Sequence, residues 1–269
     1  MNSTNRFDFN AKLVFYLHHG FYKIMIFFEC KKGKWTILLA EVLWIINALF
    51  KTKLEMTNSD TIFYCETKFG KYFSGKDLTN TIIVSSAFER NDKELLFKII
   101  GNHLKKKRKV LFLDVGAHIG VYAVTLGDRF RRYKNLKIIA FEPDSDMFLM
   151  NSFALMKKNV AINNLRNISL NHYGLGNHEG INRIGVKVNK LDSVLTQKYI
   201  NSYDVLFIKI DIEGHEINAL KGAQNILKNT KNVELMVEDC VNPKIITYLK
   251  KNRFTLINKV SPYNSFWCK

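Results

Sequence analysis

Short apolar runs alternate with helical patterns over residues 105–269, and this alternation predicts an α/β fold. Between the runs, apolar residues recur at the three- and four-residue spacing of an amphipathic helix, as at Ile217, Leu220 and Leu227. Strands that alternate with helices pair in parallel, so we expect a Rossmann-like, doubly wound, mostly parallel sheet of seven strands. The expected strands are Val110–Val115, Leu136–Phe141, Ile168–Tyr173, Val205–Ile210, Val233–Glu238, Phe254–Lys259 and a short one near Ser265–Cys268.

Changes in this pattern divide the chain into three regions. Residues 105–269 form the expected α/β domain, interrupted by a Gly- and Asn-rich insertion, Gly174–Asn189, that is typical of irregular chain or a hairpin. Residues 61–104 are a lead-in of short strands around Gly70, followed by an amphipathic helix over Phe88–Leu104. Residues 1–60 are an apolar and basic N-terminal helical extension.

The N-terminal extension contains two apolar stretches, Leu13–Phe28 and Trp35–Phe50, with a lysine cluster over residues 31–34 between them. A bilayer-spanning helix needs roughly 20 apolar residues and tolerates a central charge poorly, so Glu41 argues against a membrane span. No small-residue cleavage site follows, which disfavours a signal peptide. Two interpretations remain. The segment is either a helical layer packed on the α/β domain or an interfacial helix that makes peripheral membrane contact through residues 13–50.

The chain is strongly basic, with 41 Lys+Arg against 24 Asp+Glu and a net charge of +17. Such an excess favours anionic surroundings: phosphate-bearing molecules, nucleic acid or a membrane face. The basic residues are spread widely without a nucleic-acid motif, so no nucleic-acid partner is expected, and a solvated basic surface is the simpler interpretation. The four cysteines show no metal or disulfide spacing, which indicates a reducing, cytoplasmic location.

The first candidate site is the turn after the strand Val110–Val115. Asp114 ends this strand, and Gly116 and Gly120 lie in the turn that leads to the next helix; the following strand is succeeded by Glu142. Glycines allow the backbone to approach a nucleoside closely, and a carboxylate at the neighbouring strand tip can bind ribose hydroxyls. Because the turn is not G-x-G-x-x-G, the pattern favours S-adenosylmethionine over a nicotinamide cofactor.

The second candidate site follows the strand Val205–Ile210, which contains Lys209 and leads into Asp211 and Glu213. The carboxyl ends of parallel strands meet at one edge of a sheet, so we expect these carboxylates to face the same cavity as the first site. Asp211 and Glu213 would orient or deprotonate a hydroxyl acceptor. Lys209 would neutralise one of them or bind a substrate anion.

A structural interpretation of the same residues stays open. Glu213 and Glu216 also suit the electrostatics of a helix N-terminus, and Lys209 also suits a structural ion pair. Two carboxylates do not by themselves make a metal site, so no metal is expected.

Taken in order, the motifs resemble those of the FkbM family of S-adenosylmethionine-dependent methyltransferases. The matching segments extend over most of residues 61–269, and it is their order that is specific, because each segment alone is common. The N-terminal extension lies outside the resemblance. The segments are Asp114–Gly120, Phe141–Pro143, Asn159–Asn164 with Asn167, Leu191–Leu195, Ile208–Gly214 and Leu220–Ala223.

The resemblance implies a class I methyltransferase fold and methyl transfer, usually to an oxygen of a carbohydrate or secondary metabolite. Asp114, Gly116 and Gly120 would line the methionine end of the cofactor, with Glu142 on the ribose. The family commonly has Asn where this chain has His118. We therefore include His118 among the cofactor-site residues, with its partner open between the cofactor carboxylate, the acceptor and solvent.

The expected function is therefore O-methylation of a hydroxyl on a glycan precursor or secondary metabolite, as in polysaccharide biosynthesis. Asp211, Glu213 and Lys209 are the expected catalytic residues. The basic runs at residues 105–109 and 129–132 suit an anionic or lipid-linked acceptor, although plain solubility explains the first run equally well. The alternatives are a non-catalytic S-adenosylmethionine-binding subunit of a glycan-assembly complex and, more distantly, a nucleotide-dependent oxidoreductase. Specificity is expected in the insertion and the N-terminal extension, since loops carried on a scaffold commonly determine it.

Overall fold

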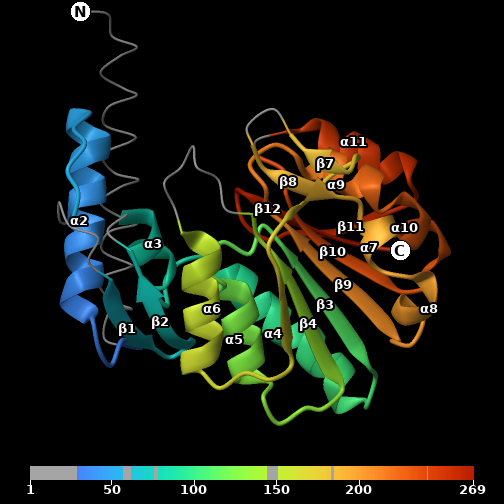
Figure 1. Ribbon diagram of the computed structural model, residues 1–269, viewed down its shortest axis with the longest axis horizontal. Helices are drawn as coiled ribbons and strands as arrows, with labels where there is room; N and C mark the ends of the chain where they lie inside the picture. Colours follow the sequence, from blue (N-terminus) through green and yellow to red (C-terminus); the bar gives the residue numbers. More distant parts are fainter. Residues whose placement is uncertain (1–28, 57–61, 76–77, 144–150, 183–184, 241) are drawn as a thin grey trace, which may run out of the picture. The chain divides into compact units, whose positions relative to one another are not determined.

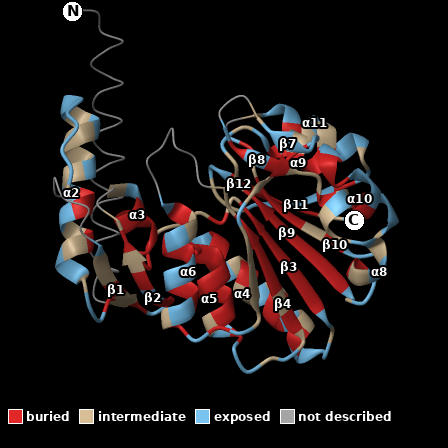
Figure 2. Cartoon of the chain, in the orientation of Figure 1, coloured by how far each residue is buried: buried red, intermediate tan, exposed pale blue. Residues whose placement is uncertain are grey.

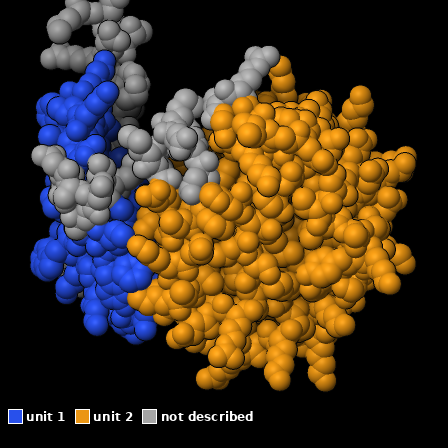
Figure 3. Space-filling model, viewed as in Figure 1, with its two compact units in different colours: residues 1–90 blue, residues 91–269 orange. Residues whose placement is uncertain are grey.

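The computed structural model describes residues 29–56, 62–75, 78–143, 151–182, 185–240 and 242–269. The chain separates into two compact units, residues 1–90 and 91–269, which Figure 3 colours separately. The strands of the expected lead-in belong to the first unit. Its helix, α4 (Arg90–Lys105), belongs from Asn91 onward to the second. The apolar stretch Leu13–Phe28 lies outside the described residues.

The N-terminal unit consists of a long helix, a β-hairpin and a short helix. These are α2 (Lys34–Phe50), the antiparallel strands β1 (Phe63–Thr67) and β2 (Gly70–Ser74), and α3 (Leu78–Ile83). Helix α2 packs against α3 and β1. Gly33, at the start of α2, has a φ of 77°, and a Cβ there would lie 2.5 Å from the Tyr64 carbonyl oxygen. The close approach of α2 to β1 therefore requires glycine at this position.

Helix α2 has a buried side and an apolar exposed side. Ile37, Ala40 and Glu41 are buried, whereas Trp35 and Phe50 are 70% and 71% exposed. Within the described part of the chain, no helix combines the length and the apolar character needed to cross a bilayer. Both interpretations of the N-terminal extension, packing and interfacial binding, stay predictions.

The second unit is built on a seven-stranded sheet in the order β11-β12-β10-β9-β3-β4-β5. The five strands β10, β9, β3, β4 and β5 pair in parallel, and β12 lies antiparallel between β10 and β11. This confirms the Rossmann-like, mostly parallel sheet predicted from the sequence. The strands are β3 (Val110–Val115), β4 (Leu136–Phe141), β5 (Ile168–Asn171), β9 (Val205–Ile210), β10 (Val233–Glu238), β11 (Thr255–Lys259) and β12 (Asn264–Cys268).

Helices cover both faces of this sheet (Figure 1). One face carries α4, α5 (Val121–Arg129) and α6 (Ser152–Ile162), and the other carries α9 (Glu216–Gly222), α10 (Gln224–Asn229) and α11 (Lys244–Lys251). The short helices α7 (Leu191–Val194) and α8 (Gln197–Ile200) precede β9. Every residue of β3 and β9 is buried, as Figure 2 shows for the middle of the sheet. Burial on both faces explains why these strands are continuous apolar runs rather than alternating ones.

Alternation along the strands decides which residues face which helical layer. The Phe112 and Phe207 rings stack at 5.4 Å, and Phe207 meets Phe266 at 5.9 Å, so these side chains of β3, β9 and β12 share one face. Lys209, two residues beyond Phe207, contacts Tyr122 of α5. The shared face is therefore the one covered by α4, α5 and α6.

The insertion between β5 and α7 folds as a small sheet of its own. Strands β7 (Gly180–Ile181) and β8 (Lys187–Asn189) form an antiparallel hairpin, and β6 (Gly174–Leu175) pairs in parallel with β8. The sequence predicted either irregular chain or a hairpin for the insertion, and β7 and β8 form a hairpin. A Cβ on Gly222 would lie 1.8 Å from the Gly176 carbonyl oxygen, so α9 and the insertion pack in close contact.

Candidate active site

The strand order reverses between β3 and β9. From β3 the chain adds β4 and β5 on one side, and then β9 and β10 on the other. In open α/β sheets, ligands bind outside the carboxyl ends of the strands at such a switch point. The first motif follows β3 and the second follows β9, two neighbouring parallel strands. The fold therefore brings both predicted sites to one edge of the sheet.

Asp114 connects β3 to the helix that follows. Its side chain is fully buried, and its Oδ2 accepts a hydrogen bond from the Ala123 amide at 3.0 Å. Ala123 lies in the first turn of α5, where amides have no partner within the helix. A negative charge is also favoured at this end of a helix dipole. Asp114 therefore fixes the position of the turn between β3 and α5.

The turn itself has a left-handed backbone at every second residue: φ is 80° at Gly116, 52° at His118 and 83° at Gly120. A Cβ on Gly116 would lie 1.8 Å from the Asp211 carbonyl oxygen, so only glycine fits there. A Cβ on Gly120 would lie 2.9 Å from Met156 Cγ. The fold itself thus requires both glycines, and the contact at Gly116 places the two motifs directly against each other.

Glu142 follows β4 and is attached to the same turn. Its Oε2 accepts a hydrogen bond from the His118 amide at 2.8 Å. The amides of Gly116 and Ala117 donate to the Phe141 carbonyl oxygen at 3.0 and 3.1 Å. These bonds join the turn to the tip of β4 and orient the Glu142 carboxylate at the sheet edge. The structure thus brings Glu142 and His118 together through the His118 backbone.

Lys209 and Asp211 form an ion pair at the end of β9. The Lys209 Nζ lies 3.0 Å from Asp211 Oδ2 and 4.5 Å from the centroid of the Tyr122 ring. Lys209 is 3% exposed, whereas the Asp211 side chain is 27% exposed. A buried ammonium needs such a carboxylate and benefits from an aromatic face. Lys209 therefore neutralises Asp211, and the Asp211 carboxylate still reaches solvent.

The loop after Asp211 separates the two glutamates that follow. Glu216 is fully buried, and its Oε1 accepts hydrogen bonds from the amides of Ile212 at 3.2 Å and Gly214 at 2.8 Å. Glu213 is exposed and has a φ of 52°. Partial desolvation, and then the charges of Asp211 and Glu216, raise the pKa of Glu213, while Lys209 opposes the shift. Glu216 therefore stabilises the loop, and Glu213 lies at its surface.

Glu238 is a further carboxylate of this edge that the sequence interpretation did not single out. Val237 pairs with Ile210 in the parallel register, so Glu238 lies beside Asp211. Burial and the charge of Asp211 raise the pKa of Glu238 to about 7, although a hydrogen bond from the Cys240 thiol at 3.4 Å opposes the shift. This carboxyl group therefore titrates near neutral pH.

Asn264 and Asp92 extend the polar row past Glu238. Asn264 begins β12 and pairs with Glu238 in register. Its Nδ2 lies 3.4 Å from Asp92 Oδ2 in the first turn of α4, and both residues are buried. The neighbouring Lys93 is also buried, with its Nζ 6.0 Å from the Tyr122 ring. Helix α4 thus contributes charged groups to the face that carries Lys209.

Comparison with known proteins decides the family. Residues 114–256 match the model of the methyltransferase FkbM domain. The chain belongs to the FkbM methyltransferase family. Membership confirms the resemblance found in the sequence and implies S-adenosylmethionine as the methyl donor. No curated protein matches this FkbM chain.

Several solved structures resemble the FkbM chain at low identity. A SAM-dependent methyltransferase from Aquifex aeolicus is 15% identical over 68% of this chain and 92% of its own, with a TM-score of 0.42. The M1A22 tRNA methyltransferase TrmK of B. subtilis is 14% identical over 64% of this chain and 63% of its own, with a TM-score of 0.38. A precorrin-6y C5,15-methyltransferase from Geobacter metallireducens is 13% identical over 64% of this chain and 86% of its own, with a TM-score of 0.38. This chain spans less than two thirds of the B. subtilis enzyme.

The sequence held a signal for Glu238 but a weaker one for its neighbours. Glu238 ends an apolar run with a carboxylate, as Asp114 does in the FkbM turn. Asp92 and Lys93 lie in a helix whose apolar pattern was clear, and nothing in that pattern indicates that two charged residues are buried. Among the described residues, no group of three His, Cys, Asp or Glu side chains is arranged to hold a metal ion.

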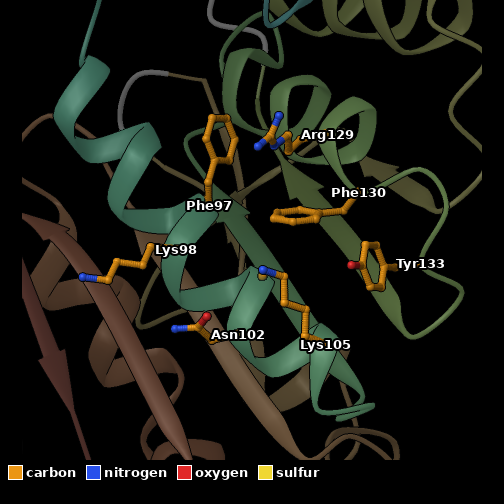
Figure 4. Close-up of a pocket in the computed structure, with 8 residues that line it drawn as sticks. Phe97, Lys98, Asn102, Lys105, Arg129, Phe130 and Tyr133 are labelled. Atoms are coloured by element: carbon orange, nitrogen blue, oxygen red, sulfur yellow. The ribbon is translucent and has the colours of Figure 1, made fainter.

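A cavity of about 370 Å³ lies away from the FkbM motifs, between α4 and the end of α5 (Figure 4). The Arg129 guanidinium lies 5.4 Å from the Phe97 ring, and Phe130 meets both Phe97 and Tyr133 edge to face. Both helices end toward the amino ends of the strands, so this basic cavity is at the opposite edge of the sheet. The described residues that line it include no acidic one: they are Phe97, Lys98, Gly101, Asn102, Lys105, Arg129, Phe130 and Tyr133.

Proposed function

We propose that this FkbM chain transfers the methyl group of S-adenosylmethionine to a hydroxyl oxygen of a glycan precursor or secondary metabolite. The observation that carries the proposal is the joining of the two motifs at the switch point between β3 and β9. There the Gly116 turn lies against the Asp211 backbone, and the Lys209–Asp211 pair lies beside it.

The residues at this edge fit the charges of the cofactor. S-adenosylmethionine carries a cationic sulfonium and a ribose with two hydroxyls. We assign the ribose to Glu142, whose carboxylate is oriented by the His118 amide, and the methionine end to the turn from Asp114 to Gly120. A carboxylate can accept about four hydrogen bonds, so the bond from the His118 amide uses only part of the capacity of Glu142. Asp114 adds a buried negative charge behind the turn.

When bound, the cofactor supplies a methyl group that the positive sulfur has already activated. The protein has to align the acceptor oxygen, exclude water and remove one proton if the acceptor is an ordinary alcohol. Asp211 is suited to accept a hydrogen bond from the acceptor hydroxyl, because Lys209 holds it in place and it still reaches solvent. Glu213, exposed at the same edge, is suited to bind further hydroxyls of a sugar.

The charge of the edge favours an acceptor without phosphates close to its reacting hydroxyl. Asp211, Glu213 and Glu238 lie together there and would repel a nucleic-acid backbone. The basic runs at residues 105–109 and 129–132 lie toward the amino ends of the strands, about 20 Å away for a strand of six residues. We therefore propose that these runs do not hold the reacting part of the acceptor.

The test is to incubate the protein with isotopically labelled S-adenosylmethionine and extracts of glycans, metabolites and nucleic acids. Mass spectrometry then identifies the labelled product. The expected result is label on a hydroxyl oxygen of a carbohydrate or secondary metabolite. Label on nucleic acid would refute the proposed acceptor class. Cofactor binding without any labelled product in these extracts would favour the non-catalytic subunit instead.

A further inference from the structure

Four strand ends present polar side chains on one face of the sheet at its carboxyl edge. Asp114, Lys209 and Phe266 lie on the face covered by α4, α5 and α6, as shown by the Phe112, Phe207 and Phe266 stack and the Lys209–Tyr122 contact. Side chains alternate along a strand, so residues two positions apart share a face. These side chains form a polar row across the sheet. In the order of the strands, it consists of Asp114 on β3, Lys209 and Asp211 at the end of β9, Glu238 on β10 and Asn264 on β12.

Glu238 lies in the middle of this row, between Asp211 and Asn264. The register places Asp211 beside it on β9 and Asn264 opposite it on β12. Its environment is acidic, and the cation of this row, Lys209, is bound to Asp211. The described titratable groups that act on Glu238 or adjoin it are Asp211, Glu213, Glu216, Cys240, Asp239 with its partner Lys259, and Asp92 through Asn264.

We propose that Glu238 is the general base of the reaction and accepts the proton of the acceptor hydroxyl. This assignment rests on the proposed function. The acceptor oxygen forms a bond to the methyl carbon, the carbon–sulfur bond breaks with its electron pair remaining on sulfur, and the hydroxyl proton passes to Glu238. Glu238 then releases the proton to solvent, so the step balances without another reagent.

The neighbouring carboxylates are less suited to this task. Asp211 is already bound to Lys209, and a proton arriving on Asp211 would leave the buried Lys209 ammonium without its carboxylate. Glu213 is exposed, so water competes for its carboxylate. Glu216 accepts two backbone amides and holds its own loop. A general base works best when its pKa is near the working pH, and the pKa of Glu238 is raised to about 7.

The first test needs no acceptor or cofactor. In protein labelled with ¹³C at the glutamate carboxyl carbons, the Glu238 resonance is the one missing from Glu238→Gln. We expect it to titrate at about 7 in the wild type, and at lower pH in Asp211→Asn, because that variant removes a neighbouring negative charge. A wild-type titration at the ordinary glutamate value of 4.5 would overturn the assignment.

The second test measures the rate of methyl transfer as a function of pH, with the acceptor that the labelling experiment identifies. The wild-type rate should rise with pH through about 7, because the base must be ionised. In Glu238→Gln the rate should no longer rise with pH, and methyl transfer should be roughly 10²–10⁴-fold slower than in the wild type. Its affinity for S-adenosylhomocysteine should stay within about threefold of the wild-type affinity. Glu55 is an exposed glutamate of the N-terminal unit, so Glu55→Gln is the matched control. It should keep the wild-type rate, with its pH dependence, and the wild-type affinity for S-adenosylhomocysteine.

The outcomes separate this assignment from the proposed function. Labelled product from the wild type and from Glu238→Gln at equal rates would overturn the role of Glu238 and leave the methyltransferase proposal intact. No labelled product from the wild type would overturn the proposed function and this role with it. If Glu238→Gln does not fold, Glu238→Asp, which also removes the labelled glutamate, identifies the same resonance, and the titration itself is made on wild-type protein.

Discussion

The two edges of the sheet carry opposite charges, and they differ in how those charges are held. At the amino edge, lysines and arginines surround an open cavity, and Lys105 and Arg129 extend into solvent. At the carboxyl edge the described charged side chains are mostly carboxylates, and Asp114, Lys209 and Glu216 are buried there and bound by named partners.

This difference shows why net charge was a poor guide to the site. The excess of +17 is distributed over solvated side chains, whose interactions are screened and weak. Buried charges interact strongly and must be positioned by the fold, and such groups are enriched at functional sites. We therefore expect substitutions at the carboxyl edge to have large effects and substitutions at the amino edge to have small ones.

The largest effect should come from Asp211→Asn. Removing this carboxylate takes away the partner of Lys209 and the charge beside Glu238, so methyl transfer should fall by roughly 10²-fold or more. Affinity for S-adenosylhomocysteine should stay within a few-fold. A labelled-methyl assay and calorimetry measure the two quantities. Asp128→Asn, near the basic cavity, is the control and should retain activity; equal activity of Asp211→Asn would contradict the account.

Lys209→Met should produce the next largest effect, on stability. It leaves the Asp211 carboxylate without its cation at the end of a buried strand. Breaking a fully buried pair costs about 3–5 kcal/mol, and the partial exposure of Asp211 reduces this to about 2 kcal/mol. The melting temperature should fall by roughly 4–8 °C. An unchanged melting temperature would show that the pair is as weak as a surface ion pair.

Glu238→Gln should change stability in a pH-dependent way. A carboxyl group with a raised pKa holds its proton in the folded state between 4.5 and about 7, so the stability it contributes is present at low pH and is lost as the pH rises through 7. At pH 8 the variant should melt about 2–4 °C higher than the wild type, which corresponds to about 1 kcal/mol after allowing for solvent screening.

At pH 4 the same variant and the wild type should melt together, because Glu238 is then mostly protonated in both the folded and the unfolded protein. Scanning calorimetry at the two pH values measures the difference. A Glu238→Gln effect of equal size at both pH values would mean that the variant changes packing rather than charge.

The smallest effect is expected at the basic cavity. Lys105 and Arg129 are exposed, so the double variant Lys105→Gln, Arg129→Gln should change the free energy of unfolding by less than about 0.5 kcal/mol. Methyl transfer should stay within about twofold. A larger loss of activity would show that the amino edge takes part in acceptor binding and would remove the contrast between the two edges.

The sequence predicted the fold because the central strands are buried on both faces. Such strands are continuous apolar runs, and β3, β4, β9 and β10 have the bounds expected from the sequence. The strand β5 was expected to run to Tyr173 but ends at Asn171. It lies at the edge of the sheet and is only half buried, so its apolar pattern is less distinct. The division at Arg90 could not be read from local pattern, because it depends on contacts between distant segments.

The convergence of the candidate residues was predicted where a motif ends a strand, and it was not predicted where the fold brings together residues from separate elements. Asp114, Glu142 and Asp211 follow apolar runs, so their convergence followed from parallel pairing. Asn264 and Asp92 come together from β12 and α4, which lie far apart in the sequence. The role of Glu216 was visible only in its hydrogen bonds to Ile212 and Gly214, because helix-start acids are usually exposed.

Calorimetric titration with S-adenosylhomocysteine tests the central claim most directly, that the carboxyl edge between β4, β3 and β9 binds the sulfonium nucleoside. The wild type should bind with measurable heat, and Glu142→Ala should bind roughly tenfold more weakly, since it loses the carboxylate assigned to the ribose. Lys105→Gln, at the opposite edge, should bind like the wild type. No heat with the wild type, or equal binding by Glu142→Ala, would contradict the account.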